Sequence, residues 1–547
     1  MYQEKRSGLY LPDGVRTVGQ QRQEAAMRAI ISAINSGYSH YGASRTGANM
    51  LGWNSYSGSA KEDIEDNLDV LRQRSRDAYM GIPTATAALK TLRTNVIAGG
   101  LMPSPQIDGE FLRMTNEQAE ELQAQILREF SLWADSPVCD ADRIDDFYSL
   151  QQLAYLGSLM NGDSFAVLQT KKRPGCPYDL RVRLVEADRV CSPGYHDRQT
   201  RSVVEGHTVE SIIQGVETDT DGEIKAYWIA DKHPRSYTTL KLQDWKRVEA
   251  YSSTGRKNIL HVMSRERAGQ RRGVPLLAPV LETLKQLERY ADAETTAALL
   301  GAIFTVFVKK GGISDEGPFG QVMQEEILKA LTGKRDPNDL ALGAGLIFDL
   351  ELGESIETVE TQHPHSGYDT FMMARTKQAS AAMEIPVEVL FKRFDSQFSS
   401  ARGALNEFWR TCGMQREWFA EDFCQPIYET WLAEAVARGR IRAPGFFDDP
   451  AIRKAYTDCK WNGPSKTALN PSQEVEAAIK RVAEGFSTAE EETAQLTGGD
   501  YNRNIRKRLV EAKRKREVDE ERNPATEKPA PPQSGAGEKK TGGNGDV

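Results

Sequence analysis

The stretch between residues 275 and 383 constrains the fold most, because two helix-forming segments bracket a strand-forming insert. In the first segment, apolar residues recur at the three- and four-residue spacing of one helix face: Leu277, Leu281, Leu284, Leu287 and Ala291. Pro275 suits a first helical position, while Pro279 cannot donate a backbone hydrogen bond and is a second candidate for the start. These features predict a helix over residues 275–302.

The insert, residues 303–365, contains two segments typical of strands, AIFTVFVKKGG and GLIFDLEL. Residues 366–383 return to a helical pattern that stops before Pro386, because a residue that precedes proline disfavours helix. Two helices around a small α/β insert predict a two-helix stalk that carries a small α/β domain at its end.

Composition excludes several classes of protein. A chain of 547 residues is long enough for two or more domains with apolar cores. The net charge of −8 argues against a generally basic nucleic-acid binder, so a DNA-facing surface must be local or must avoid gripping phosphates. The six cysteines form no C-x-x-C pair, which predicts reduced, mostly buried thiols without disulfides. No signal peptide is expected, and the longest apolar run, residues 297–308, is too short to span a bilayer.

The first 274 residues predict an arm followed by a body of helices and strands. Residues 1–59 are rich in Gly, Ser, Asn and Tyr, and they suit either an arm ordered by a partner or a disordered leader. Helices are predicted over residues 61–80, TATAALKTLRTNVIAGG and NEQAEELQAQILREFSLWA. Between residues 147 and 261 the period shifts toward two. Strands are expected at DSFAVLQT, DLRVRLVEA, ESIIQGVET, EIKAYWIAD and NILHVM, with a hairpin turn at residues 219–222. The fold class is therefore α+β, with a mixed or antiparallel sheet.

Residues 384–400 are predicted to form a loop that mixes phenylalanines with two cations. A long helix is expected from Ser399 onward, with a break near Pro426. Its aromatic residues indicate core packing: Trp409, Trp418, Phe419, Phe423 and Trp431.

Four segments resemble, in order and spacing, the lambda-type family of tailed-bacteriophage portal (head-tail connector) proteins. They are RSRDAYMGIPTATAALKTLRTNVIAGG, DDFYSLQQLAYLGSLMNGDSFAVLQ, GQRRGVPLLAPVLETLKQLERYADAETTAAL and FSSARGALNEFWRTCGMQREWFAEDFCQPIYETWLAEAV. The similarity runs from about residue 55 to about residue 441 and is weak at both ends and inside the insert.

The resemblance implies a ring, usually of twelve copies, at one capsid vertex, through whose axis double-stranded DNA is packaged and ejected. It implies as partners the large terminase subunit, a head-tail connector or adaptor protein, the major capsid protein and the scaffold. Assembly in the host cytoplasm is implied, with no enzyme activity, cofactor or membrane role. Mapped onto this chain, the portal architecture has an N-terminal arm (1–59), a wing (60–274), a first stem helix (275–302), a clip (303–365), a second stem helix (366–383), a tunnel loop (384–400), a long return helix with more of the wing and a helical crown-like region (401–502), and a charged tail (503–547).

A DNA channel must not hold its cargo, because each phosphate that a cation neutralises adds salt-dependent affinity. We therefore expect acidic residues of the stem helices to contribute a negative lining field: Glu282, Glu288, Asp292 and Asp369. The alternative is that these residues are ordinary solvated charges on helix surfaces.

The tunnel loop holds the main candidates for DNA contact, which are Phe391, Lys392, Arg393, Phe394 and Gln397. A short cationic and aromatic cluster around an axis could touch the duplex backbone without reading bases. In the competing interpretation, the phenylalanines dock on the neighbouring subunit and only the two cations face DNA.

Two further charged regions are candidates for contacts with partners. Clip residues around 309–320 and 334–338 could dock the terminase motor, although plain surface loops are the alternative; the cations there are Lys309, Lys310, Lys334 and Arg335. Residues 503–516 carry eight cations and one acid, Glu511. They predict either a helix that touches DNA or an internal partner, or a solvated helix before a disordered end.

A metal-dependent hydrolase is the alternative from a different class of protein. His363, His365 and Asp369, with Glu384, offer nitrogen and oxygen ligands, but a proline separates the histidines and no H-E-x-x-H helix exists. The dinucleotide, P-loop and G-x-S-x-G fingerprints are also absent from the sequence. A monomeric DNA-binding adaptor conflicts with the acidic balance and the lack of a recognition motif. We expect neither a catalytic nor a metal site.

Overall fold

The computed structural model describes residues 55–193, 212–236, 244–303, 307–310, 354–357, 367–393, 398–466 and 470–522, together with single positions before residue 55. The chain divides into two compact units, Met1–Ser59 and Ala60–Val547, and the elements below belong to the second unit. Almost all of the expected arm and the tail beyond residue 522 lie outside the described residues.

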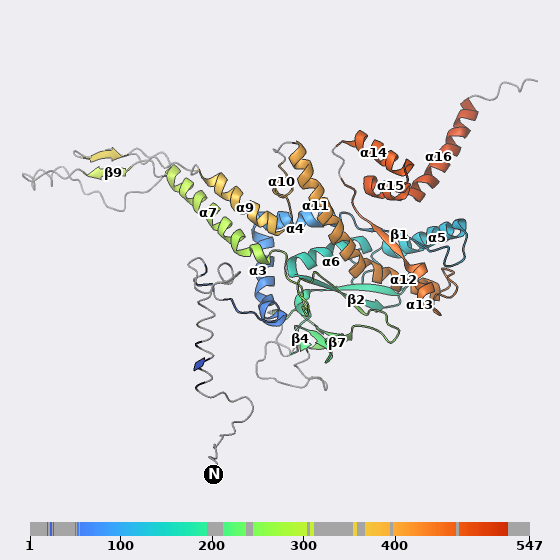
Figure 1. Cartoon of the computed structure of the whole chain (residues 1–547), viewed down its shortest axis with the longest axis horizontal. Helices are drawn as coiled ribbons and strands as arrows, with labels where there is room; N and C mark the ends of the chain where they lie inside the picture. Colours follow the sequence, from blue (N-terminus) through green and yellow to red (C-terminus); the bar gives the residue numbers. More distant parts are fainter. Residues whose placement is uncertain are drawn as a thin grey trace, which may run out of the picture. The chain divides into compact units, whose positions relative to one another are not determined.

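In the first half of this unit, a group of helices interrupted by one strand precedes a run of short strands (Figure 1). The chain begins with α2 (Ala60–Asp63), the 3₁₀ turn η3 (Glu65–Asn67), α3 (Leu68–Gly81), α4 (Pro83–Val96), β1 (Met102–Pro105), α5 (Asn116–Ala134) and α6 (Phe147–Asn161). It continues with β2 (Asp163–Thr170), β3 (Leu180–Val185), η4 (Ala187–Arg189), β4 (Ile212–Ile213), β5 (Val216–Thr218), β6 (Ile224–Ala230), β7 (Trp245–Glu249) and β8 (Ile259–Met263). The predicted mixture of helices and sheets is confirmed.

The second half is mainly helical. It comprises η6 (Ala278–Val280), α7 (Leu281–Ile303), β9 (Phe307–Lys310), β10 (Glu354–Glu357), α9 (Tyr368–Ala382), α10 (Val387–Phe391), α11 (Phe398–Phe419), the π-helical segment η7 (Ala420–Cys424), α12 (Gln425–Ala437), α13 (Pro450–Thr457), β11 (Cys459–Asn462), α14 (Pro471–Ala483), α15 (Ala489–Thr497) and α16 (Tyr501–Arg522). The helices predicted over residues 275–302 and 366–383 are present as α7 and α9. Pro279 lies in the 3₁₀ turn before α7, where its missing N–H costs no helical hydrogen bond.

All pairs of these strands are antiparallel, in the orders β3-β2-β8, β4-β5-β6-β7, β1-β11 and β10-β9. The segment DSFAVLQT forms β2 as predicted, whereas ESIIQGVET is two strands, β4 and β5, rather than one. A tight turn at Gln214 and Gly215, with φ of 48° and 82°, separates them. A Cβ at Gly215 would lie 2.5 Å from the amide nitrogen of Cys191, so this turn needs glycine. Strand β7 was not predicted.

Residues 147–161 form a helix, α6, and not the start of the β-rich region. The Asp146 carboxylate accepts a hydrogen bond from the backbone N–H of Ser149 at 2.7 Å, which caps the first turn. Gly162 ends the helix in the left-handed region, with φ of 90°. The sequence prediction placed the change of period too early by the length of this helix.

The helix predicted over residues 61–80 is also interrupted. The side-chain amide of Asn67 donates to the carbonyl oxygens of Glu62 and Asp63, both at 3.2 Å. These bonds take up carbonyls that a continuous helix would use, so the chain forms α2, η3 and α3 in place of one helix.

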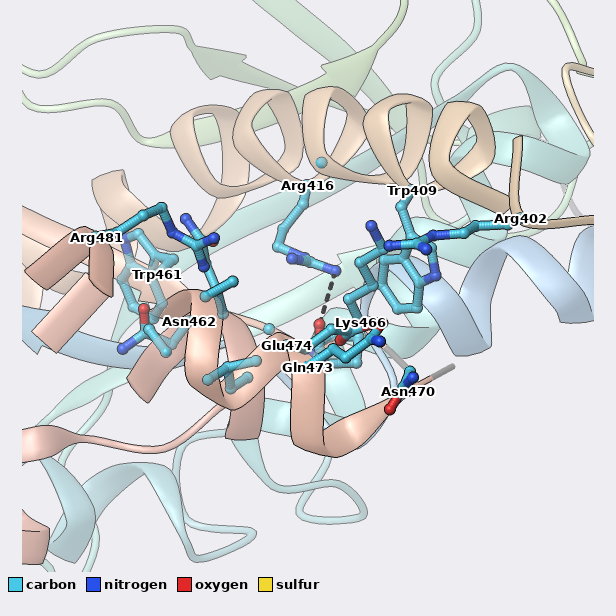
Figure 2. A pocket seen from close by; sticks show the side chains of 17 residues that line it. Arg402, Trp409, Arg416, Trp461, Asn462, Lys466, Asn470, Gln473, Glu474 and Arg481 are labelled. Carbon is cyan, nitrogen blue, oxygen red and sulfur yellow. Dashed lines mark hydrogen bonds between the residues drawn. The ribbon is translucent and has the colours of Figure 1, made fainter. Parts of the chain in front are cut away.

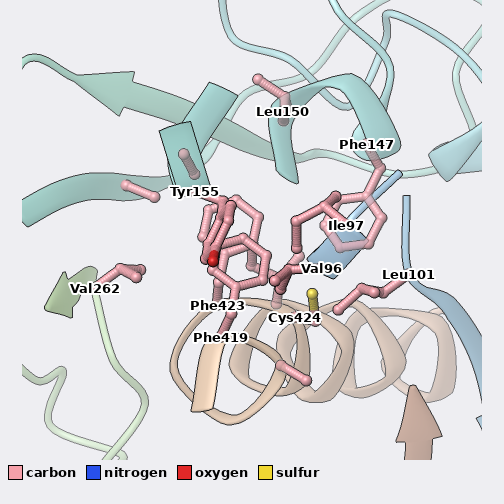
Figure 3. Close-up of a cluster of buried hydrophobic side chains, with 14 of the residues drawn as sticks. Val96, Ile97, Leu101, Phe147, Leu150, Tyr155, Val262, Phe419, Phe423 and Cys424 are labelled. Carbon is pink, nitrogen blue, oxygen red and sulfur yellow. The ribbon is translucent and has the colours of Figure 1, made fainter. Parts of the chain in front are cut away.

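The main hydrophobic core joins α4 and α6 to the long segment α11–η7–α12, as the gathered side chains in Figure 3 show. Phe130 packs against Trp133, Phe147 and Trp431, with ring centroids 5.6, 5.6 and 4.9 Å apart. Phe419, Phe423 and Trp431 are buried, as their aromatic pattern predicted. The prediction was wrong for Trp418, which is 49% exposed.

The helix break predicted near Pro426 is absent, because α11 continues through η7 into α12. Pro426 falls in the first turn of α12, directly after the wide π-helical turn. The widened turn leaves room for the proline ring and removes the need for its N–H. The segment therefore connects the end of the expected tunnel loop directly to the core.

The cysteine prediction is confirmed. All six cysteines are free, and the buried ones are Cys139, Cys191, Cys412 and Cys424. Burial raises the pKa of the Cys412 thiol to about 12, which keeps it protonated and unreactive. None of the helices in the described part of the chain combines the length and apolarity that a membrane span needs.

A buried carboxylate, Asp163 at the start of β2, ties three parts of the body together. Arg72 of α3 and Arg272 from the segment before α7 pair with it at 3.1 and 2.6 Å, and the three side chains are at most 1% exposed. The Arg272 guanidinium also donates to the carbonyl oxygens of Val190 at 2.7 Å and Ala187 at 2.9 Å. Burial by itself raises the pKa of Asp163, but the two guanidiniums outweigh it and lower the pKa well below its ordinary value.

We expect Asp163→Asn to destabilise the protein by about 3–5 kcal/mol, because it leaves two buried guanidiniums without their counter-charge. Differential scanning calorimetry would record this as a lower Tm. Asp142→Asn is the matched control, since Asp142 pairs with Arg183 at 3.1 Å but is 54% exposed. The control should cost less than about 1 kcal/mol, and an equal loss in the two variants would contradict the special role of Asp163.

The wild type and Asp163→Asn should also differ in how their stability depends on pH. Because the folded-state pKa of Asp163 lies below the unfolded value of about 3.9, its stabilisation is complete above that pH and is lost as the pH falls further. Asp163→Asn should therefore lose less Tm than the wild type between pH 5 and pH 3.

Candidate functional site

Helices α7 and α9 pack against each other in antiparallel directions. Tyr290 of α7 stacks on Tyr368, with centroids 5.4 Å apart, and meets Phe371 edge-on at 5.0 Å. Nearer the body, the Arg375 guanidinium donates to the side-chain oxygen of Gln286 at 2.9 Å. Residues far apart in the sequence therefore form the predicted two-helix stalk, visible in Figure 1.

The half of this pair near the body is anchored and the far half is exposed. Leu284 and Leu287 of α7 and Ala379 of α9 are buried. Between residues 291 and 299 of α7, by contrast, no described residue is buried. Leu299 is 59% exposed and Phe371 is 48% exposed. The far half thus keeps apolar side chains in contact with solvent when the chain is alone.

The structure places the four candidate lining acids on these helices. Glu282, Asp292 and Asp369 are exposed, whereas Glu288 is half-buried and accepts a hydrogen bond from Lys285 Nζ at 2.5 Å. Glu288 and Asp292 lie one turn apart on α7, while Glu282 points about 80° away from Asp292 around the helix. One face of α7 therefore carries two of the acids together, and Lys285 offsets part of their charge.

The first half of the predicted tunnel loop is helical. Pro386, with φ of −57°, leads into α10, and Leu390 of α10 is buried in the main core. The Ser380 hydroxyl donates to the carbonyl oxygen of Ile385, and Glu384 adopts a left-handed φ of 55°. These contacts make a fixed corner between α9 and α10 where a loop was expected. The available signal was the i, i+3 spacing of Val387 and Leu390.

Three of the five tunnel-loop candidates follow directly after this buried anchor. Phe391 is 46% exposed, and Lys392 and Arg393 are also exposed. Lys392 ends α10 in the left-handed region with φ of 55°, and the backbone N–H of Arg393 donates to the carbonyl oxygen of Glu388 at 2.9 Å. Phe394 and Gln397 lie outside the described residues. The aromatic and cationic side chains described here share one exposed tip.

The expected clip is described only at its base. Strand β9 pairs with β10, and Lys309 and Lys310 stand opposite Ser355 and Glu354. The predicted strand GLIFDLEL, together with Lys334 and Arg335, lies outside the described residues. The described strand pair brings the two ends of the insert side by side.

The structure describes part of the predicted tail. Residues 501–522 form α16, and every lysine and arginine between Arg503 and Arg516 is exposed on it. This agrees with a solvated charged helix and leaves its surface open to a partner.

The ligands expected for a metal-dependent hydrolase do not form a described cluster. His363 and His365 lie outside the described residues, and Asp369 is exposed on the first turn of α9. Within the described ranges, the carboxylates and histidine close enough to share an ion are those of Glu186, Asp188 and His233. Arg76 already pairs with both of these acids, at 3.7 Å for Glu186, so its guanidinium offsets part of their negative charge.

Residues 46–416 match the family described as phage portal protein, lambda family. Portal protein B of Escherichia phage lambda is 21% identical over 482 residues, which cover 85% of this chain and 87% of that protein. The portal protein of Escherichia phage N15 is 22% identical over 495 residues, which cover 88% and 91%.

Solved structures with some similarity include a chain from the neck of a native GTA particle computed with C12 symmetry. Its TM-score is 0.40 and its identity 12%, over 79% of this chain and 93% of that chain. An HK97-family phage portal protein from Corynebacterium diphtheriae has a TM-score of 0.30 and 12% identity, over 74% and 98%.

Proposed function

This chain belongs to the lambda family of phage portal proteins, and on that premise we propose that its copies close into a ring of twelve around a channel for double-stranded DNA. The portal role is structural rather than catalytic. The family match, with its two portal relatives, supports this function over a metal-dependent hydrolase or a monomeric DNA-binding adaptor.

The exposed far half of the α7–α9 pair is the observation that carries the ring. Leu299 and Phe371 are about half exposed or more, and Met373 is 38% exposed. Apolar side chains exposed along a pair of helices suit a surface that another protein covers. A neighbouring copy would cover them, and a contact between two different faces closes into a ring when its rotation allows.

We propose that the acids of the stem helices keep the duplex moving. Glu282, Glu288, Asp292 and Asp369 would repel phosphates, so that the stem adds little binding energy along the DNA. The exposure of three of these acids supports this assignment. The pairing of Glu288 with Lys285 makes it the weakest contributor of the four.

The exposed tip after α10 is proposed as the point of transient DNA contact. Lys392 and Arg393 would meet phosphates, and Phe391 would pack beside them, together with Phe394 and Gln397 further along the chain. The burial of Leu390 supports this role, because an anchored base can hold the cations at a constant distance from an axis.

The remaining partners are proposed from the family. Lys309 and Lys310, with Lys334 and Arg335, would dock the large terminase subunit and afterwards a head-tail connector protein. The edge of a β-strand is a suitable place for such a partner, and β9 carries two of these cations. The ring would assemble with the major capsid protein and scaffold in the host cytoplasm and remain at the capsid vertex of the virion.

Negative-stain electron microscopy of the purified protein tests the ring. We expect annular particles with a central hole for the wild type, and none for Leu299→Asp combined with Phe371→Asp, because charge at these positions opposes burial. Leu299→Met combined with Phe371→Leu keeps both positions apolar and should still form rings. Strictly single-chain wild-type particles under assembly conditions would refute the proposal.

Replacing both tip cations, Lys392→Ala with Arg393→Ala, should reduce the DNA packaged or retained per particle while rings still form. Lys171→Ala with Lys172→Ala is the control, because it removes two adjacent exposed cations from the loop after β2. The DNA content of purified particles measures the effect. Packaging and retention at the level of the control would rule out a DNA contact at the tip.

Charge reversal in the stem, Glu282→Lys with Asp292→Lys, should slow DNA release at low salt, since the new cations would bind phosphates. Raising the salt concentration should restore the rate, because screening weakens these contacts. Release kinetics measured at two salt concentrations check this, and an unchanged rate at both would reject the lining role.

A further inference from the structure

A basic cleft lies between α11 and the helices α14 and α15. In Figure 2, Arg402, Trp409 and Arg416 project from α11 toward Lys466 and α14. The cleft has a volume of about 700 Å³, and its lining includes four cations but one carboxylate, that of Glu474. In a chain with a net charge of −8, this is a local excess of positive charge.

Arg416 is held in place without being neutralised. Its guanidinium donates to the carbonyl oxygens of Val96 at 3.0 Å, Asn95 at 3.1 Å and Pro464 at 3.3 Å, the last drawn as the dashed line in Figure 2. Burial lowers the pKa of this guanidinium, and no carboxylate of the described residues lies within ion-pair distance of it. The carbonyls fix its direction, and its positive charge remains in the cleft.

The other cations of the cleft differ in whether a carboxylate of the chain already pairs with them. Arg481 already pairs with Glu492 at 2.6 Å, so its charge is balanced within the chain. Arg402 and Lys466 are exposed at the mouth of the cleft. Three cations are therefore available to a ligand, and two of these are arginines, whose planar forks suit phosphate.

The cleft is longer than a single small anion. Arg402, Trp409 and Arg416 are each seven residues apart on α11, which places them on one face of the helix. At the helical rise, Arg402 and Arg416 are separated by roughly 21 Å. One DNA strand carries a phosphate about every 3.4 Å along the axis, so this distance corresponds to several consecutive phosphates. Amide donors from Asn462 and Asn470 also line the cleft, as in backbone contacts to DNA.

We propose that this cleft binds the phosphate backbone of duplex DNA at a site separate from the stem helices and the tip after α10. The inference rests on the proposed function, because a portal ring brings duplex DNA to the chain. Weak contacts here would hold DNA beside the channel without adding grip along the stem.

The test compares two double variants with equal loss of charge. Arg402→Ala with Lys466→Ala removes the two exposed cleft cations, and Arg410→Ala with Lys480→Ala removes two exposed cations of α11 and α14 that do not line the cleft. Fluorescence anisotropy with a labelled 24-base-pair duplex would be measured from 50 to 200 mM salt. For the cleft variant we expect affinity roughly tenfold lower at 50 mM and a salt slope smaller by about two, with the control close to wild type.

Three results would overturn the proposal. The first is an equal loss of affinity in both double variants, which would show only general electrostatic attraction. The second is displacement of the duplex by inorganic phosphate at matched ionic strength, which would show a single-anion pocket. The third is displacement by poly-L-glutamate as readily as by unlabelled duplex, which would favour an acidic polypeptide.

Electron microscopy of the same preparations tests ring formation separately from DNA binding in the cleft. Rings without cleft-dependent DNA binding would reject the cleft alone, and cleft-dependent binding without rings would reject the proposed ring alone.

Discussion

Asp163 is buried together with the two arginines that pair with it, and the rest of the structure depends on this cluster. It joins α3, the start of β2 and the segment that enters α7, and all of its charges are removed from water. The backbone closes tightly at the same point, since a Cβ at Gly273 would lie 1.8 Å from the carbonyl oxygen of Gly162. Buried ions tolerate few alternative arrangements, because any arrangement that separates them leaves a charge unpaired. The direction in which α7 leaves the body is thereby defined.

From this point outward, burial decreases along the chain. The near half of the α7–α9 pair shares the main core through Leu284, Ala379 and Met383, whereas the far half exposes Leu299 and Phe371. The proposed ring would explain this gradient, because a neighbouring copy would bury the surface that the chain leaves open. The corner at α10 shows the same change from buried to exposed residues, with Leu390 in the core and the adjacent Phe391 in solvent.

The distribution of charge agrees with the proposed passage of DNA, which the protein would approach without binding it strongly. The chain is acidic as a whole, yet cations gather at the tip after α10 and in the cleft beside α11. Because binding to phosphate grows with the number of cations engaged, a few local contacts would position a duplex while the acids proposed to line the channel would limit its affinity. Lys285 pairs with Glu288 and would moderate the negative field proposed for these helices.

Sequence alone determined the family, the helices α7 and α9, strand β2, the turn at residues 219–222 and most of the aromatic core. These features arise from local periodicity or from several segments that resemble one family in order and spacing, which a single chain displays directly. The exposed positions of Phe391, Lys392 and Arg393 were also predictable, although Phe391 ends the helix α10 and the two cations follow it, where a loop was expected. Only the tertiary structure joined Asp163 to partners 91 and 109 residues away, exposed Trp418 and placed Lys466 opposite Arg402. The heptad spacing of Arg402, Trp409 and Arg416 was visible in the sequence, but not the surface that faces it. A local pattern shows which side of an element is apolar or charged, while the partner that covers that side is chosen by packing between distant segments.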